Sequence, residues 1–180
     1  VFKLIPLPQK SITLLIPFKS AEDACKAVSL IFMAGITPCA LEFIERDAID
    51  WALKYSDVKI DIEDDIDAHL LVEVDGNDID ALYVDCENIQ EVVSQFECGE
   101  ITLADNESHK DMLWKLRRSI SEAVKSNSVY KEEDTVVPRA ELPKLLRGVK
   151  EIGKIYGFKS VCYGHAGDGN LHVNIIKGDM

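Results

Sequence analysis

The sequence predicts an α+β fold in which ferredoxin-like split βαβ units, duplicated along the chain, form an antiparallel sheet with helices on one face. Two observations lead to this prediction. Short apolar runs alternate with segments of helical periodicity in the order β-α-β-(short α)-β-α-β, and a similar succession begins again near residue 106. The composition, 47% hydrophobic and 29% charged over 180 residues, is that of an ordinary globular domain. The second succession stops early, so we expect this half to be truncated.

The first unit is predicted over residues 11–105, after a linker at 1–10 that leads in from an upstream part of a larger protein. Residues 11–18 are apolar and rich in β-branched side chains, which favours a strand. Ser20 and Asp23 have the spacing of a capping box, and the helix that they begin ends at Gly35. The elements that follow are expected as a strand at 38–46, a short helix at 48–55, a strand at 68–74, a helix at 78–96 and a strand at 100–103.

The second, partial unit is predicted over residues 106–180. Its elements are expected as a helix at 108–125, an extended segment at 128–137, a helix at 142–156 that ends at Gly157, and strands at 160–166 and 171–176. Because the chain starts without Met and stops soon after the last strand, we expect it to be a piece of a larger protein.

The net charge of the chain limits the classes of partner that it can bind. It carries 32 acidic and 20 basic side chains, a net charge of −12. Such a field repels phosphate backbones and anionic lipids, so nucleic acid and membrane surfaces are poor candidates. No apolar run approaches the ~18 residues of a membrane-spanning helix. The five cysteines include no CxxC pair, and no signal peptide is recognisable, which indicates a reducing, cytoplasmic setting.

The segment 163–174, YGHAGDGNLHVN, carries the most chemical information. Asp168-Gly169 is a dipeptide typical of two-residue hairpin turns. Such a turn would place His165 opposite His172, and Tyr163 opposite Asn174, on one face of the hairpin, with opposed Cβ atoms ~4.5–5.5 Å apart. Two imidazoles at that separation can share one divalent ion. A pair of surface histidines bonded to neighbours explains the pattern equally well, so both interpretations stay open.

A second informative segment is 113–121, LWKLRRSIS. Arg117 and Ser121 are one helical turn apart, beside an apolar stripe of leucine and isoleucine. A guanidinium at the edge of a core, with a hydroxyl next to it, suits the binding of a carboxylate. Lys131, in the extended segment that follows, could add a second positive charge. The alternative is an ordinary surface arginine in an ion pair.

Several short motifs occur in a fixed order along nearly the whole chain: PCALEF at 38–43, LLVEV at 70–74, LWxxR at 113–117, VP at 137–138 and GHAGDGNLH at 164–172. With these motifs the chain resembles the C-terminal domain of FAD-linked oxidases, a family of glycolate oxidase D subunits, D-lactate dehydrogenases and D-2-hydroxyglutarate dehydrogenases. The resemblance implies a domain that caps an FAD held mainly by a separate N-terminal domain.

The resemblance also implies roles for single residues. His165 and His172 would be catalytic residues that bind a divalent metal, Zn or Mn. Arg117, Ser121, Lys131 and Asn174 would contact the substrate. Arg118 departs from the family pattern, which usually has Glu at this position. The family's later Glu-His-Gly segment, which supplies the third metal ligand, would lie beyond Met180.

These observations favour a flavin-dependent oxidoreductase that oxidises a small anionic D-2-hydroxy acid, such as glycolate or D-lactate, to the 2-oxo acid. The isolated chain is expected to be inactive without its flavin domain. An electron-acceptor protein, further subunits and a second copy of the chain are candidate partners. The alternative is a non-enzymatic ferredoxin-like module that binds a ligand or a metal, since fold alone does not establish function.

Overall fold

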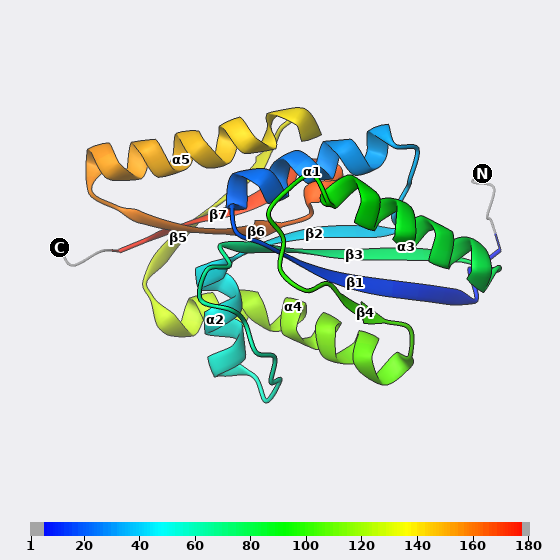
Figure 1. Ribbon diagram of the computed structural model, residues 1–180. Helices are drawn as coiled ribbons and strands as arrows, with labels where there is room; N and C mark the ends of the chain where they lie inside the picture. Colours follow the sequence, from blue (N-terminus) through cyan, green and yellow to red (C-terminus); the bar gives the residue numbers. More distant parts are fainter. Residues whose placement is uncertain (1–5, 178–180) are drawn as a thin grey trace, which may run out of the picture.

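A single antiparallel sheet of seven strands, in the order β4-β1-β3-β2-β6-β7-β5, organises the computed structural model, which describes residues 6–177 (Figure 1). The strands are β1 (Lys10–Phe18), β2 (Ala40–Glu45), β3 (Ala68–Gly76), β4 (Thr102–Ala104), β5 (Tyr130–Val136), β6 (Lys159–Gly164) and β7 (Asn170–Ile176). The helices are α1 (Ala21–Met33), α2 (Arg46–Tyr55), α3 (Ile79–Val93), α4 (Glu107–Asn127) and α5 (Leu142–Tyr156), with short 3-10 turns η1 (Arg139–Glu141) and η2 (Ala166–Asp168).

The elements predicted from periodicity are confirmed, with boundaries shifted by a few residues. The Ser20 half of the predicted capping box is confirmed, because the Ser20 hydroxyl accepts a hydrogen bond from the backbone N–H of Asp23 at 3.2 Å. The Asp23 carboxylate instead accepts from Nζ of Lys26 at 2.8 Å. The predicted linker lies partly at residues 1–5, outside the described residues. Residues 6–9 have no regular structure, and Lys10 already belongs to β1. Among the helices described, none is both long and apolar enough to cross a membrane.

The sheet contains the predicted duplication. In the first unit β3 lies between β1 and β2 and runs antiparallel to both, which is a split βαβ arrangement. In the second unit β7 lies between β5 and β6 in the same way. The two units meet where β2 pairs with β6, at Phe43–Gly164 and Ile44–Tyr163. The β2–β6 junction therefore brings the first unit against the GHAGDGNLH motif.

Helices cover both faces of the sheet, whereas the sequence analysis expected them on one face. Figure 1 shows α1, α3 and α5 on one side and α2 and α4 on the other. The cause is visible in the central strands, whose apolar runs are nearly continuous instead of alternating. Leu14 and Leu70 pack into the main core, while the adjacent Leu15 and Leu71 pack into a cluster beneath α4. Both faces therefore had to be covered.

Candidate functional site

The β6–β7 hairpin differs from its predicted register by two residues. Tyr163 pairs with His172 and Val161 pairs with Asn174, so the predicted pairs His165–His172 and Tyr163–Asn174 are wrong. The chain does not turn in two residues at Asp168-Gly169. It passes through the 3-10 turn η2 instead, with Gly169 in the left-handed region at φ 75°. His165 leaves the strand ladder, and its carbonyl accepts a hydrogen bond from the Asn170 backbone N–H at 3.1 Å.

A shift of two residues leaves every side chain on its predicted face, because side chains alternate with a period of two. Tyr163, His172 and Asn174 therefore share the face covered by α2 and α4. The ring of His165 returns towards this face, with its centroid 5.8 Å from that of His172. The sequence analysis thus brought the correct two imidazoles together through an incorrect pairing.

Glu42, on β2, joins two of the predicted site residues and was not singled out from the sequence. Its Oε2 accepts hydrogen bonds from Nε and Nη2 of Arg117, at 2.9 and 2.7 Å. Its Oε1 lies 2.7 Å from Nδ1 of His165. The side chains of Glu42 and Arg117 are only 7% and 11% exposed, so this is a buried ion pair that extends to an imidazole. The available signal was the position of Glu42 inside the PCALEF motif.

Tyr163 is the second residue that the sequence analysis did not assign. The guanidinium carbon of Arg117 lies 5.3 Å from the centroid of its ring, and the His172 ring centroid lies 5.4 Å away. Burial raises the pKa of Tyr163, and the nearby Ser121 hydroxyl, Arg117 guanidinium and Asn174 amide act in the opposite direction. Tyr163 thus connects the predicted residues of α4 with those of β7.

Carboxylates also surround His172. Its Nδ1 lies 3.1 Å from Oε1 of Glu132 and 3.7 Å from Oδ1 of Asp134, both on β5. Asn174 is completely buried, and its amide donates to the Val161 carbonyl at 3.4 Å. The Asn174 Oδ1 has no hydrogen-bond partner among the described residues. The structure therefore places Asn174 behind the site, as part of its wall.

Lys131 does not join this cluster. In β5, Glu132 is paired with Asn174 and Lys131 with Ile175, so Lys131 points to the opposite face of the sheet. Its side chain is 74% exposed, and its ammonium lies 3.3 Å from the Glu133 carboxylate. The sequence analysis placed Lys131 beside Arg117 because it counted positive charges without the strand's orientation. The structure brings together Arg117, Ser121, His165, His172 and Asn174.

The hydrogen-bond partners of the His165 and His172 rings indicate whether these rings are oriented to bind a metal ion. A metal-binding histidine commonly directs its second ring nitrogen to a carboxylate. His165 meets Glu42 through Nδ1, which leaves its Nε2 for a ligand. Nδ1 of His172 lies 3.1 Å from Oε1 of Glu132 but has no hydrogen-bond partner among the described residues. No group of three or more potential ligand side chains forms within residues 6–177. Only His165 thus has the carboxylate partner typical of a metal ligand, and the described part of the chain does not complete a metal site.

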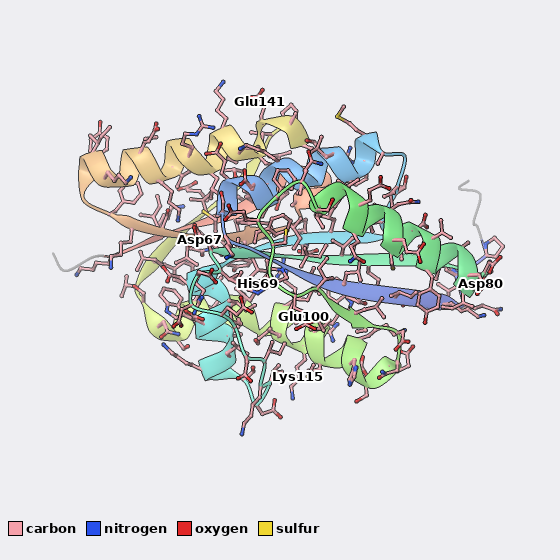
Figure 2. All side chains as sticks on the ribbon, viewed as in Figure 1. Asp67, His69, Asp80, Glu100, Lys115 and Glu141 are labelled. Carbon is pink, nitrogen blue, oxygen red and sulfur yellow. The ribbon has the colours of Figure 1, made fainter. Side chains whose placement is uncertain are left out.

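The remaining two histidines lie apart from this cluster. His69, labelled in Figure 2, is 3% exposed on β3, and its desolvation lowers its pKa to about 4. His109 lies in the first turn of α4, where its backbone N–H donates to the capping Asn106 side chain at 3.1 Å.

Comparisons with known proteins agree with this architecture. Residues 7–179 match the model of a family described as "FAD linked oxidases, C-terminal domain". The chain is 33% identical to a D-lactate dehydrogenase of Anaerostipes hadrus over 99% of its length, and 31% identical to glycolate oxidase subunit GlcD of Bacillus subtilis over 96%. It is also 31% identical to a D-2-hydroxyglutarate dehydrogenase of Stutzerimonas stutzeri over 87% of its length. It spans only 38%, 36% and 34% of these relatives, respectively.

Solved structures share the fold at much lower sequence identity. A 4-ethylphenol oxidase from Gulosibacter chungangensis superposes on 97% of this chain with a TM-score of 0.66 and 12% identity, and the match covers 40% of that protein. A p-cresol methylhydroxylase superposes on 99% of this chain with a TM-score of 0.64 and 12% identity, over 41% of its own length. At this identity the likeness concerns the fold alone.

Proposed function

The chain belongs to the family of FAD-linked oxidase C-terminal domains, and from this premise we propose that it forms the substrate side of a flavin-dependent oxidoreductase that converts a D-2-hydroxy acid to the 2-oxo acid. The observation that carries the proposal is the network in which Glu42 links Arg117 to His165, next to His172. It combines a cation for a carboxylate with imidazoles for a hydroxyl, which are the two polar groups of such a substrate.

FAD is implied by the family and not by a nucleotide-binding motif in this chain. Gly164, Gly167 and Gly169 do not have the spacing of a phosphate-binding loop, and they lie in a hairpin turn that no helix follows. FAD, held by the longer parent protein, would supply the two-electron acceptor for the hydrogen on the substrate's α-carbon.

Arg117 is proposed to bind the substrate's carboxylate with the donors that Glu42 leaves free. A guanidinium has five N–H donors, and only Nε and Nη2 are engaged by Glu42. The buried carboxylate also fixes the orientation of the guanidinium, so less conformational entropy is lost on binding. Ser121, one helical turn further along α4, contributes a hydroxyl near Tyr163.

His165 and His172 are proposed to hold a divalent ion through their Nε2 atoms. Three carboxylates and one guanidinium lie against or near the two rings, so the local charge favours a cation. The ion would supply a Lewis acid for the 2-hydroxyl group. Water, substrate or a segment outside residues 6–177 would have to provide the other ligands.

The test is flavin reduction in the full-length parent protein. The purified parent is expected to show flavin absorbance that bleaches anaerobically with glycolate, D-lactate or another D-2-hydroxy acid, and not with the L-enantiomers of the chiral acids. Arg117→Met should raise the concentration of acid needed for half-maximal bleaching at least about tenfold, the loss of one charge-assisted interaction. A parent without flavin, or with a flavin that none of these acids reduces, would refute the proposal and favour the non-enzymatic module.

A further inference from the structure

Helix α4 is attached to the sheet by polar contacts as well as by its apolar face. Lys110, Trp114 and Arg117 follow one another at spacings of four and three residues, so they lie on one flank of the helix. Lys110 contacts β1, Trp114 contacts β3 and Arg117 contacts β2, and these three strands are adjacent in the sheet. Each of the three strands therefore holds one turn of α4 by a polar contact of its own.

The contact of Trp114 is made with a carboxylate that is itself held in place. Nε1 of Trp114 donates to Oε2 of Glu73 at 2.6 Å, and the hydroxyl of the completely buried Thr13 donates to the same oxygen at 2.6 Å. Glu73 lies on the same face of the sheet as Glu42, because Glu42 is opposite Leu71 on β3 and side chains alternate with a period of two. Two carboxylates on neighbouring strands thus receive the donors of two successive α4 turns.

The apolar contacts of α4 do not fix its position as sharply as these hydrogen bonds do. Leucine and isoleucine side chains are buried on the neighbouring flank of the helix, and the hydrophobic effect is not directional. A hydrogen bond weakens steeply as its angle departs from linearity, so the indole N–H opposes both rotation and sliding of the helix. Trp114 and Arg117 are three residues apart and are therefore neighbours on the helix surface. The bond of Trp114 to Glu73 thus holds the turn next to the one that carries the guanidinium.

We propose that Trp114 is a positioning residue for Arg117: through Glu73 it fixes the turn of α4 from which the guanidinium reaches the substrate's carboxylate. The proposal rests on the proposed function and adds to it the group that holds the carboxylate-binding residue in place. Arg117 has to keep its bonds to Glu42 and at the same time present its remaining donors to the substrate. A displacement of about 1 Å in such an arrangement can cost about a hundredfold in rate, so the orientation of α4 matters to the site.

Hydrogen exchange of the Arg117 side chain tests this position in the chain itself. Its Nε–H donates to the buried carboxylate of Glu42, so its exchange, followed in ¹H–¹⁵N spectra, should be slow. Trp114→Phe keeps an aromatic ring and removes the N–H. It should accelerate this exchange at least about tenfold relative to that of the Leu116 backbone N–H, the effect of one hydrogen bond to a charged group. Glu73→Gln, which keeps an acceptor oxygen without the charge, should have an intermediate effect.

Lys110→Met is the matched control. It removes the polar contact of the same helix flank with β1, two turns before Arg117, so it should lower stability and leave the ratio of the two exchange rates unchanged. A general loss of stability accelerates the exchange of both protons together. An unchanged ratio in Trp114→Phe would therefore overturn the proposal, as would an equal increase of the ratio in Lys110→Met.

The full-length parent provides the second test. Trp114→Phe should raise the KM for the hydroxy acid and leave kcat nearly unchanged, because the substrate's carboxylate is bound in the ground state and in the transition state alike. In the Arg117→Met background it should have no further effect, whereas additive effects on KM would contradict the positioning role. Lys110→Met should change neither constant. A parent that oxidises no D-2-hydroxy acid refutes the proposed function, and the exchange of the Arg117 Nε–H still decides whether Trp114 positions this side chain.

Discussion

The buried carboxylate of Glu42 supports the most direct prediction. Glu42→Gln keeps the shape of the side chain and removes its charge. In the native chain one carboxylate oxygen of Glu42 bonds Arg117 and the other bonds His165. The glutamine amide has only one acceptor oxygen for these two donors. Its NH₂ group must also face one of these two side chains. The variant should therefore lose contacts on both sides of the network.

The expected magnitude follows from burial. Removal of one partner from a buried ion pair costs about 3–5 kcal/mol, and the remaining amide acceptor offsets part of this. We expect Glu42→Gln to lower the free energy of unfolding by about 2–4 kcal/mol, equivalent to roughly 4–16 °C in Tm for a chain of this length. The Glu42 and Arg117 side chains are 7% and 11% exposed, so solvent screens this pair weakly.

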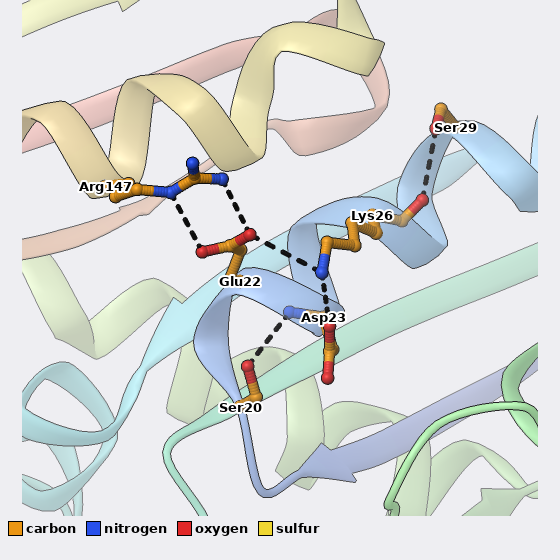
Figure 3. Close-up of polar contacts among 6 residues, drawn as sticks. All are labelled: Ser20, Glu22, Asp23, Lys26, Ser29 and Arg147. Carbon is orange, nitrogen blue, oxygen red and sulfur yellow. Dashed lines mark hydrogen bonds and ion pairs between the residues drawn. The ribbon is translucent and has the colours of Figure 1, made fainter.

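A double-mutant cycle isolates the pair. Glu42→Gln, Arg117→Met and the double variant are compared by urea unfolding, and we expect a coupling energy of about 2 kcal/mol. The control is Glu22 with Arg147, which joins α1 to α5 on the surface through the same two arginine nitrogens, Nε and Nη2 (Figure 3). Arg147 bonds both oxygens of Glu22, whereas Arg117 donates twice to Oε2 of Glu42. Because that pair is open to solvent, its coupling should be far smaller.

The imidazole gives a second readout that general destabilisation would not change. With Glu42 accepting from Nδ1–H, neutral His165 carries its lone pair on Nε2. ¹⁵N chemical shifts should therefore report an Nδ1–H tautomer in the native chain and a loss of this preference in Glu42→Gln. If the coupling of Glu42 to Arg117 did not exceed that of Glu22 to Arg147, and the tautomer stayed the same, the assigned role of Glu42 would be wrong.

Three further predictions concern pH, metal and backbone. Desolvation lowers the pKa of His69 to about 4 in the folded chain, against 6.5 in the unfolded chain, so protonation favours unfolding. The free energy of unfolding should therefore be highest above pH 7 and fall by about 2 kcal/mol towards pH 5. His69→Gln should reduce this dependence when urea unfolding is measured at several pH values. Titration with Zn²⁺ or Mn²⁺ should give tighter binding to the native chain than to His165→Ala, and equal weak binding would remove the metal from the proposal. Gly169→Ala should lower the Tm more than Gly35→Ala does. Both glycines have positive φ, but only at position 169 would the added Cβ meet the Val137 carbonyl. Similar decreases in Tm for the two variants would contradict this close contact.

Much of the fold could be predicted because its signals are local. The Ser20 cap, the glycine that ends α5 and the apolar periodicity of the helices act within a few residues, and the order of elements then limits the topology. The covering of both sheet faces was missed for a physical reason. Continuous apolar strands were assigned as strands, but their lack of alternation, which means burial on both sides, was not used.

The site could be predicted only in part. Side chains alternate between the two faces along a strand, so the sequence shows which of them share a face. Contacts between strands depend on their register, which the sequence does not show. Parity placed His172 and Asn174 on one face even though the turn was longer than expected. The same parity argument, applied to β5 relative to β7, would have excluded Lys131, but the register of β5 was unknown. Glu42 was missed because its partners are 75 and 123 residues away in the chain.

The charges around the imidazoles bear on how this acidic chain would bind the proposed anionic substrate. Glu132 and Asp134 lie against His172, and Glu42 lies against His165 and Arg117, so an anion that approaches the rings alone meets more negative than positive charge. A divalent cation at the rings would reverse this balance. Cation and substrate should therefore bind cooperatively, each raising the affinity for the other by the same factor.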